Sequence, residues 1–202
     1  MNATVKLIGV LTLTCLGAGL LLAWVQDVTR EPIARAEAAR RLAAIREVLP
    51  EAPEPLKACA VTDPLDGSEQ RLLARFDADG RWTALALESR SDAGYAGPIT
   101  LMAGMLRDAD DTLTLSGIYI LGHAETPGLG AKIQDTEFRA RLAGRPVRTT
   151  RWHLKDAGDI DGISAATISS EAVLAALRQA FARVERLSDA IVESATLPAE
   201  QP

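Results

Sequence analysis

One uninterrupted apolar run near the amino terminus constrains this chain more than any other feature. Residues Leu7 to Val25 (LIGVLTLTCLGAGLLLAWV) contain no charged side chain. A helix rises about 1.5 Å per residue, so a run of this length spans the roughly 30 Å hydrocarbon core of a membrane. A cleaved signal peptide is the alternative, but its apolar region is shorter and ends in a small-residue cleavage site, which we do not find after Trp24. We therefore expect residues 1–27 to form an uncleaved transmembrane anchor.

The residues after the anchor, Thr29 to Leu49, predict an amphipathic helix. Pro32 is tolerated in a first helical turn, and Pro50 ends the pattern. Apolar residues recur at helical spacing, at Ile33, Ala36, Leu42, Ile45, Val48 and Leu49. A surface helix that packs on the folded domain is favoured over a partner-binding helix. Including the linker EAPEPLKA, we assign residues 28–57 to helix and linker, and residues 58–202 to the folded domain.

Between Ala58 and Leu121, short apolar runs alternate with turns, which predicts an antiparallel sheet. Asp79 and Gly80 suit a hairpin turn. The expected strands are KACAV, RLLARF, RWTALALES and TLSGIYIL. The segment PITLMAGML, which starts at Pro98, fits a strand or a helix, and we favour the strand.

The last third of the chain predicts two helices and one further strand. A helix is expected near Asp135 to Leu142, a strand at RTTRWHL, and a final helix from about Ser170 to Ile191. The final helix has an apolar stripe formed by Val173, Leu177, Phe181, Val184 and Ile191. The elements together predict an α+β fold, with an antiparallel sheet flanked by helices and one N-terminal transmembrane helix.

Composition excludes two classes of function. The net charge is −5 and the basic residues form no stripe, which argues against a nucleic-acid partner. The two histidines are too few for the three or four ligands that a transition-metal site needs, so we expect no metal. Cys15 lies in the apolar run and Cys59 lies outside it, so we expect both to be free thiols.

Three glycine-containing segments carry polar groups that simple turns do not need: SDAGYAGPI, LGHAETPGLGAKI and DAGDIDGISAATISSEAV. The third places Asp161, Ser164, Thr167, Ser169 and Ser170 just before the final helix, where unpaired backbone N–H groups favour an anion such as phosphate. Helix capping by these hydroxyls is the alternative, because Ser, Thr and Asp are the preferred N-cap residues. A nucleophilic hydrolase is disfavoured, since no nucleophile-elbow pattern is present.

The segments DGISAATISS, HAETPGLGAKI and GYAGPI resemble the FMN-binding domain of the G subunit of the Rnf (Rsx) electron-transport complex. The C subunit of the sodium-pumping NADH:quinone oxidoreductase is related. The resemblance implies that FMN is joined by a phosphoester to the Thr that ends a Ser/Thr-Gly-Ala-Thr motif, here Thr167. It also implies that a separate flavin transferase makes this bond from FAD, so the chain needs no catalytic base of its own.

The resemblance further implies a set of cofactor-binding positions in residues 58–202. Glu125, Thr126 and Lys132 would supply hydrogen bonds, and Gly128 and Gly130 would let the backbone approach the ligand. Tyr95 would contact the flavin ring, with room given by Gly94. The remaining predicted positions are Asp161, Ser164, Ala166 and Leu129. Ala165 stands where the family has Gly, and if its backbone is left-handed this costs on the order of 1 kcal/mol.

The resemblance implies a redox subunit of a translocase complex rather than a stand-alone catalyst. Its expected partners are the other subunits, the flavin transferase and the membrane, and electrons would pass between ferredoxin and NAD. The expected location is the bacterial inner membrane, with a single span and a periplasmic soluble domain. A C-type quinone oxidoreductase subunit or a stand-alone tethered flavin shuttle is one alternative. An anion-binding or scaffold module without covalent flavin is the other.

Overall fold

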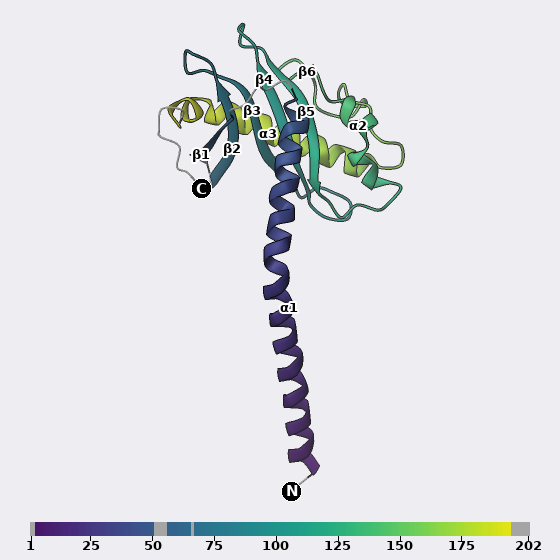
Figure 1. The fold of residues 1–202 in the computed structure, drawn as a ribbon. Helices are drawn as coiled ribbons and strands as arrows, with labels where there is room; N and C mark the ends of the chain where they lie inside the picture. Colours follow the sequence, from purple (N-terminus) through teal and green to yellow (C-terminus); the bar gives the residue numbers. More distant parts are fainter. Residues whose placement is uncertain (1–2, 51–55, 66, 195–202) are drawn as a thin grey trace. The chain divides into compact units, whose positions relative to one another are not determined.

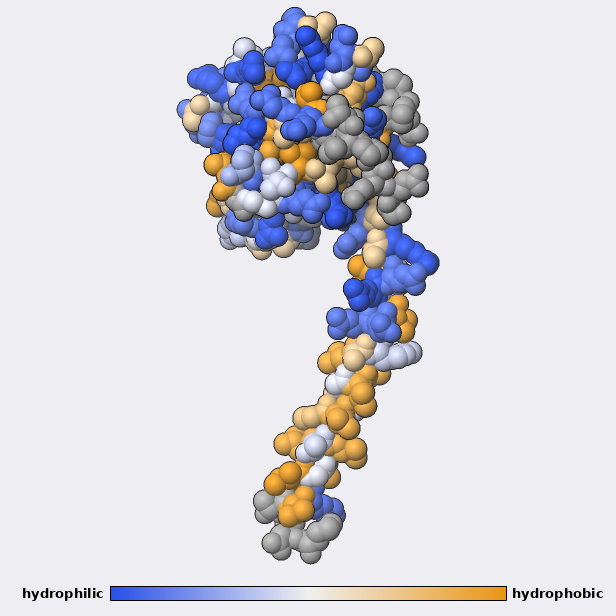
Figure 2. Space-filling view, turned by 90° about the vertical axis from the view of Figure 1, so that its left-hand side faces the viewer, coloured by the Kyte–Doolittle hydropathy of each residue, from blue (hydrophilic) through white to orange (hydrophobic). Residues whose placement is uncertain are grey.

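The computed structural model describes residues 3–50, 56–65 and 67–194, and the chain divides into two compact units at Arg40/Arg41. The described residues of the first unit belong to one helix, α1, which runs from Ala3 to Val48. Its apolar part is long enough to cross a membrane by length and composition. Figure 2 shows apolar side chains gathered along the first part of this helix, followed by polar ones. In the apolar part the Thr12 hydroxyl donates to the Ile8 carbonyl (2.8 Å), so it leaves no unpaired donor.

Helix α1 contains both helices that the sequence predicts, without the expected break between them. Pro32 lies inside the helix rather than in the first turn of a new one, so that expectation was wrong. An internal proline removes one backbone hydrogen bond, at a cost of about 3 kcal/mol. The residues that follow (AEAARRLAAIREV) are mostly strong helix formers, which offsets that cost.

The second unit contains a six-stranded sheet with the order β1-β2-β3-β4-β5-β6, in which every neighbouring pair is antiparallel. This confirms the predicted antiparallel sheet, including a strand within PITLMAGML. At the predicted hairpin turn, Gly80 adopts a φ of +76° and donates to the Asp77 carbonyl. The strands are β1 (Lys57–Thr62), β2 (Glu69–Phe76), β3 (Trp82–Ser91), β4 (Ile99–Arg107), β5 (Leu113–Gly122) and β6 (Arg145–Pro146).

The predicted strand RTTRWHL was wrong, because these residues form turns and a single isolated bridge at Leu154. The segment is ordered by Trp152 instead of by strand pairing. The Trp152 indole N–H donates to the Val147 carbonyl (2.9 Å), and its ring packs on that of Phe181 (4.9 Å between centroids). The buried aromatic residue therefore explains the strand-like composition.

One face of the sheet is covered by α3, which runs from Thr167 to Ser194 (Figure 1). The helix begins three residues before the predicted start at Ser170. The Ser89 hydroxyl on β3 donates to the Ala176 carbonyl within α3 (2.8 Å), which ties sheet and helix together. The predicted stripe is confirmed, because all of its members are buried: Val173, Leu177, Phe181, Val184 and Ile191.

A buried ion pair adds a second tie between α3 and the sheet. Asp63, which follows β1 and is 1% exposed, accepts a hydrogen bond from Arg186 on α3 (2.8 Å). This bond and one from the Leu65 N–H hold the pKa of Asp63 below its usual value.

The opposite face of the sheet receives the last turn of α1. Ala44, Ile45, Val48 and Leu49 are buried there against Ala84, Ala86 and Met102. A Cβ added at Gly104 of β4 would lie 2.3 Å from the Val48 carbonyl oxygen, so the absent side chain lets the helix approach the strand. Only the end of the predicted amphipathic stripe packs on the domain, because Ile33 and Leu42 are more than half exposed.

Two short helices lie between β5 and β6: η1 (Gly130–Gln134) and α2 (Thr136–Ala140). The second lies within the predicted helix at Asp135 to Leu142. Cys15 and Cys59 are both free, as expected.

Candidate functional site

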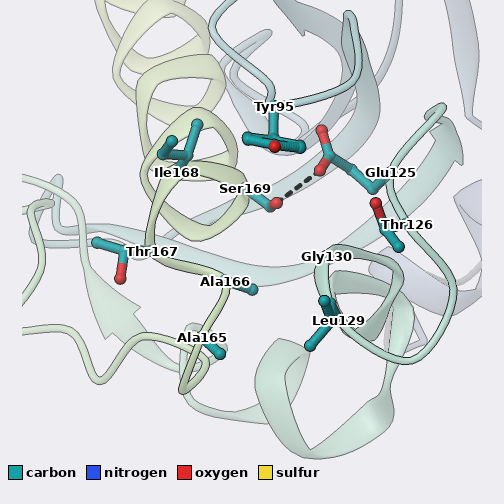
Figure 3. Close-up of a pocket in the computed structure, with 10 residues that line it drawn as sticks. All are labelled: Tyr95, Glu125, Thr126, Leu129, Gly130, Ala165, Ala166, Thr167, Ile168 and Ser169. Carbon is teal, nitrogen blue, oxygen red and sulfur yellow. Dashed lines mark hydrogen bonds between the residues drawn. The ribbon is translucent and has the colours of Figure 1, made fainter.

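A pocket of about 490 Å³ lies where three loop regions of the second unit meet (Figure 3). Its volume is within the roughly 300–1,000 Å³ typical of small-molecule sites. The three regions are the β3–β4 loop, the loop after β5, and the start of α3. The lining residues are Tyr95, Glu125, Thr126, Leu129, Gly130, Ala165, Ala166, Thr167, Ile168 and Ser169.

Strand direction explains why distant parts of the sequence meet at this pocket. Strands β3 and β5 both pair antiparallel with β4, so they run parallel to each other. The loops that follow them therefore leave the same edge of the sheet. Each of the three glycine-containing segments contributes residues to the lining of the pocket.

The Glu125 carboxylate is the most buried charged group in this site, at 4% exposure. Its Oε2 accepts a hydrogen bond from the Ser169 hydroxyl (2.7 Å), and its Oε1 accepts one from the Ala96 backbone N–H (3.2 Å). Figure 3 shows the first bond crossing from the loop to α3. One carboxylate thus joins all three regions of the pocket.

Two of the predicted glycines have distinct structural reasons. A Cβ added at Gly130 would lie 2.5 Å from Glu125 Oε2 and 2.6 Å from Ser169 Oγ, so any side chain there would disturb this hydrogen bond. Gly128 has a φ of +77°, a backbone conformation that glycine adopts without strain. Gly130 lines the pocket, whereas Gly128 shapes the turn before it.

The first turn of α3 leaves one hydroxyl available. Ala166, the residue before the helix, has no hydroxyl with which to cap it. Ser169 and Ser170 lie inside the first turn and not at the N-cap position. The Ser170 hydroxyl donates to the Ala166 carbonyl (2.9 Å) and accepts from the Ile163 N–H (3.0 Å). The exposed Thr167 hydroxyl has no hydrogen-bond partner among the described residues. This hydroxyl is therefore accessible from solvent.

The backbone N–H groups at the start of α3 can bind an anion, although the Glu125 carboxylate already accepts a hydrogen bond from Ser169 in the same turn. The first turn contains no acidic residue, and the unpaired N–H groups of a helix start carry a partial positive charge. Asp159 lies earlier in the loop that precedes α3. Hydrogen bonds from Arg151 lower the pKa of this carboxylate. That aspartate pairs with Arg151 (2.8 Å) and does not line the pocket.

Ala165 lines the pocket in the left-handed region, with a φ of +63°. A side chain costs roughly 1–2 kcal/mol in this conformation. Residue 165 therefore has a backbone conformation that glycine, the residue at this position in the related motif, adopts without strain.

The structure brings seven of the predicted binding residues together around the pocket: Thr167, Ala166, Glu125, Thr126, Leu129, Gly130 and Tyr95. Tyr95 is 72% exposed at the pocket and is not a buried corner residue. Their roles toward a cofactor stay predictions.

Five predicted residues do not line the pocket: Asp161, Ser164, Gly128, Lys132 and Gly94. The Asp161 carboxylate pairs with Lys155 (2.5 Å), and Ser164 and Lys132 are exposed. Gly94 lies directly behind the pocket, because a Cβ there would meet Glu125 Oε1 at 2.8 Å.

Three lining residues are absent from the predicted set: Ala165, Ile168 and Ser169. Ser169 belongs to the predicted cluster of hydroxyl residues at the start of the final helix. Ile168 carries a signal too, because it is an apolar residue outside the buried stripe of its helix and is 53% exposed. No group of three or more potential metal ligands occurs in the described part of the chain.

Comparisons with known proteins agree with these features. The FMN-binding domain family matches residues 94–182, a span that contains all lining residues of the pocket. The G subunit of the ion-translocating oxidoreductase complex of Methanosarcina acetivorans is 36% identical over 166 residues, which cover 81% of this chain and 85% of that protein. The protein of the same name from Vibrio atlanticus is 31% identical over 189 residues, or 88% of each chain.

Two solved structures were also found. NqrC of Shewanella oneidensis has 18% identity and a TM-score of 0.47, covering 77% of this chain and 74% of its own. The C subunit of the Na⁺-translocating NADH-quinone reductase of Parabacteroides distasonis has 20% identity and a TM-score of 0.48, covering 80% and 93%. The sequence matches, which extend over more than four fifths of the chain, establish that it belongs to the family of ion-translocating oxidoreductase complex G subunits.

Proposed function

We propose that this chain is the electron-transfer subunit of a membrane-bound ion-translocating oxidoreductase complex, with FMN in the pocket and joined by a phosphoester to Thr167. The observation that carries the proposal is the Thr167 hydroxyl, which is exposed, has no partner among the described residues and lies at the start of α3. Family membership and the FMN-binding domain match support the same cofactor.

The residues around the pocket suit the parts of FMN. Unpaired N–H groups at the start of α3 favour the phosphate, next to the hydroxyl that would be esterified. Tyr95, Leu129 and Ile168 are exposed apolar or aromatic side chains at the pocket, which suits contact with a flat ring system. Bound FMN supplies the electron transfer, and the side chains of this chain bind and orient it.

The attachment reaction requires FAD and a flavin transferase. The Thr167 oxygen forms a bond to the phosphorus of the FMN half of FAD, the pyrophosphate P–O bond breaks, and AMP leaves. The hydroxyl proton passes to a base of the transferase. The pocket carboxylate, Glu125, already accepts two hydrogen bonds and is buried, so it is poorly placed to act as this base.

The anchor places the proposed electron carrier at a membrane. Helix α1 would hold the chain in the bacterial inner membrane with one span, with the FMN-binding domain on the periplasmic side. The other subunits of the complex would deliver electrons to the flavin and remove them.

Mass spectrometry of the full chain, co-expressed with a flavin transferase, tests the proposal. We expect the added mass of FMN in the wild type and in Thr167→Ser, and its loss in Thr167→Val. Thr136→Val is the matched control, because Thr136 is also an exposed threonine at the start of a helix but does not line the pocket, and it should keep the added mass. FMN mass that persists in Thr167→Val would contradict the attachment. Yellow colour lost on denaturation would instead indicate noncovalent FMN.

A further inference from the structure

The Glu125 carboxylate holds together parts of the chain that are distant in sequence. Its partner Ser169 is 44 residues away on α3, and Ala96 is 29 residues away in the β3–β4 loop. Among the residues that the structure describes, the bond to Ser169 is the side-chain hydrogen bond that joins the first turn of α3 to the loop after β5. This hydrogen bond therefore links two walls of the pocket that also pack on each other through the core.

The surroundings of this carboxylate leave it little freedom to move. Gly130 and Gly94 approach its two oxygens so closely that a Cβ at either position would lie within 2.8 Å of one of them. Its own backbone is fixed as well, because the Glu125 N–H donates to His123 Nδ1 (3.0 Å). A buried carboxylate that is both hydrogen-bonded and enclosed sets a fixed distance between its partners.

The fixed distance matters because Ser169 lies in the same helical turn as Thr167. Fixing Ser169 against Glu125 fixes the position of this turn relative to Leu129 and Gly130, while the Thr167 side chain points away from that wall (Figure 3). A cofactor attached at one wall and contacted at the other needs this spacing. Glu125 itself is almost inaccessible, so it acts through Ser169 and Ala96.

We propose that Glu125 is the positioning residue of the flavin site, and that its hydrogen bond to Ser169 holds the first turn of α3, which carries the attachment hydroxyl, at a fixed position relative to the opposite wall of the pocket. This inference rests on the proposed function, because it concerns the geometry of the same site. It assigns the role to hydrogen bonding and not to charge.

A role in hydrogen bonding and a role of the negative charge predict different results for the substitutions Glu125→Gln and Glu125→Ala. Glu125→Gln keeps both bonds, because the amide oxygen accepts from Ala96 and the amide N–H donates to the Ser169 oxygen. Glu125→Ala leaves the Ser169 hydroxyl and the Ala96 N–H without their partner. Ser169→Ala breaks the same bond from the other side.

The experiment uses the full chain, co-expressed with a limiting amount of flavin transferase. The readouts are the fraction of chain that carries covalent FMN and the visible circular dichroism of the attached flavin. We expect Glu125→Ala and Ser169→Ala to lower the flavinylated fraction by about fivefold or more and to change the dichroism. Glu125→Gln should stay within about twofold of the wild type in both measurements.

Ser89→Ala is the matched control for general loss of stability. This substitution removes another buried serine hydroxyl, which donates a hydrogen bond to the Ala176 carbonyl of α3. Neither Ser89 nor Ala176 lines the pocket. It should leave both readouts unchanged. An equal loss in Ser89→Ala would show that only overall stability matters, and would overturn the positioning role.

Two further outcomes would also overturn it. Wild-type flavinylation and dichroism in Glu125→Ala and Ser169→Ala would remove the need for the hydrogen bond, and a Glu125→Gln chain as impaired as Glu125→Ala would assign the effect to charge. Failure of the proposed function looks different, because the wild type would then carry no covalent FMN, or Thr167→Val would retain it.

Discussion

Ala165 is the residue at which local conformation and side chain disagree most clearly. Its φ of +63° lies in the left-handed region, and it is exposed at the pocket. Substituting glycine removes the steric cost of the methyl group, but it also makes the unfolded chain more flexible. We expect Ala165→Gly to raise the free energy of unfolding by about 0.5–1 kcal/mol in urea denaturation.

Ala93→Gly is the control for this substitution. Ala93 is also an exposed loop alanine, but its φ is not positive. Here glycine relieves no strain and only increases the entropy of the unfolded chain, so stability should fall by roughly 0.4–1 kcal/mol. A loss of stability in both variants would mean that Ala165 is not strained.

Residues within a short motif were easier to predict than their partners across the pocket. Thr167 and Glu125 could be predicted because their segments resemble motifs of a known family, whereas composition alone left helix capping and a simple turn as alternatives. The bond between Glu125 and Ser169 could not, since it spans 44 residues. Ser164 and Lys132 were predicted to bind the cofactor because they lie in the motifs, but neither lines the pocket. A position within a motif does not determine which side of a loop faces the pocket.

At the level of elements, the contact between α1 and the sheet lies over two neighbouring glycines. Gly104 on β4 and Gly117 on β5 are direct cross-strand partners, and both face Val48. Only Gly104 is in close approach, since a Cβ there would lie 2.3 Å from the Val48 carbonyl oxygen, whereas the nearest atom to a Cβ at Gly117 is 3.8 Å away.

This asymmetry predicts different effects for the same substitution. Gly104→Ala should displace the last turn of α1 and lower the free energy of unfolding by about 1–3 kcal/mol. Gly117→Ala fits without displacement and should change stability by less than about 1 kcal/mol. Thermal denaturation in detergent, followed by tryptophan fluorescence, measures both. Equal losses would show that the helix end is not held by this close approach.

The strands were predictable because short apolar runs are separated by turns, and the final helix because its buried residues recur at helical spacing. The two wrong assignments, at Pro32 and RTTRWHL, have local causes that a period does not reveal. Helix formers after Pro32 extend α1 through it, and the hydrogen bond and ring packing of Trp152 replace strand pairing.

For the whole molecule, the boundary of the folded domain is the property with the clearest test. The second compact unit begins at Arg41, within α1, so it includes the last turn of that helix. A chain that starts at Arg41 keeps Ile45, Val48 and Leu49 on the sheet, whereas one that starts at Ala58 exposes the face they cover. We expect the shorter chain to be less stable by roughly 3 kcal/mol or more, since each buried aliphatic side chain contributes about 1.5–3 kcal/mol.

Thermal denaturation of the two truncated chains measures this difference. Val48→Ala in the chain from Arg41 separates helix packing from loss of the linker, and should also lower the melting temperature. Equal melting temperatures for the chains from Arg41 and Ala58 would support the domain boundary at residue 58. The sequence could not reveal this contact, because it requires knowing that β4 and β5 place their glycines side by side.

The pocket also has a consequence for the order of events in the life of the protein. One of its walls is the first turn of α3, the last helix among the described residues, while the others are formed by loops after β3 and β5. The site is therefore incomplete until nearly all of the chain has been synthesised and has folded. Under the proposed attachment to Thr167, cofactor loading follows folding, and a cell with little transferase is expected to accumulate folded, colourless protein rather than misfolded chains.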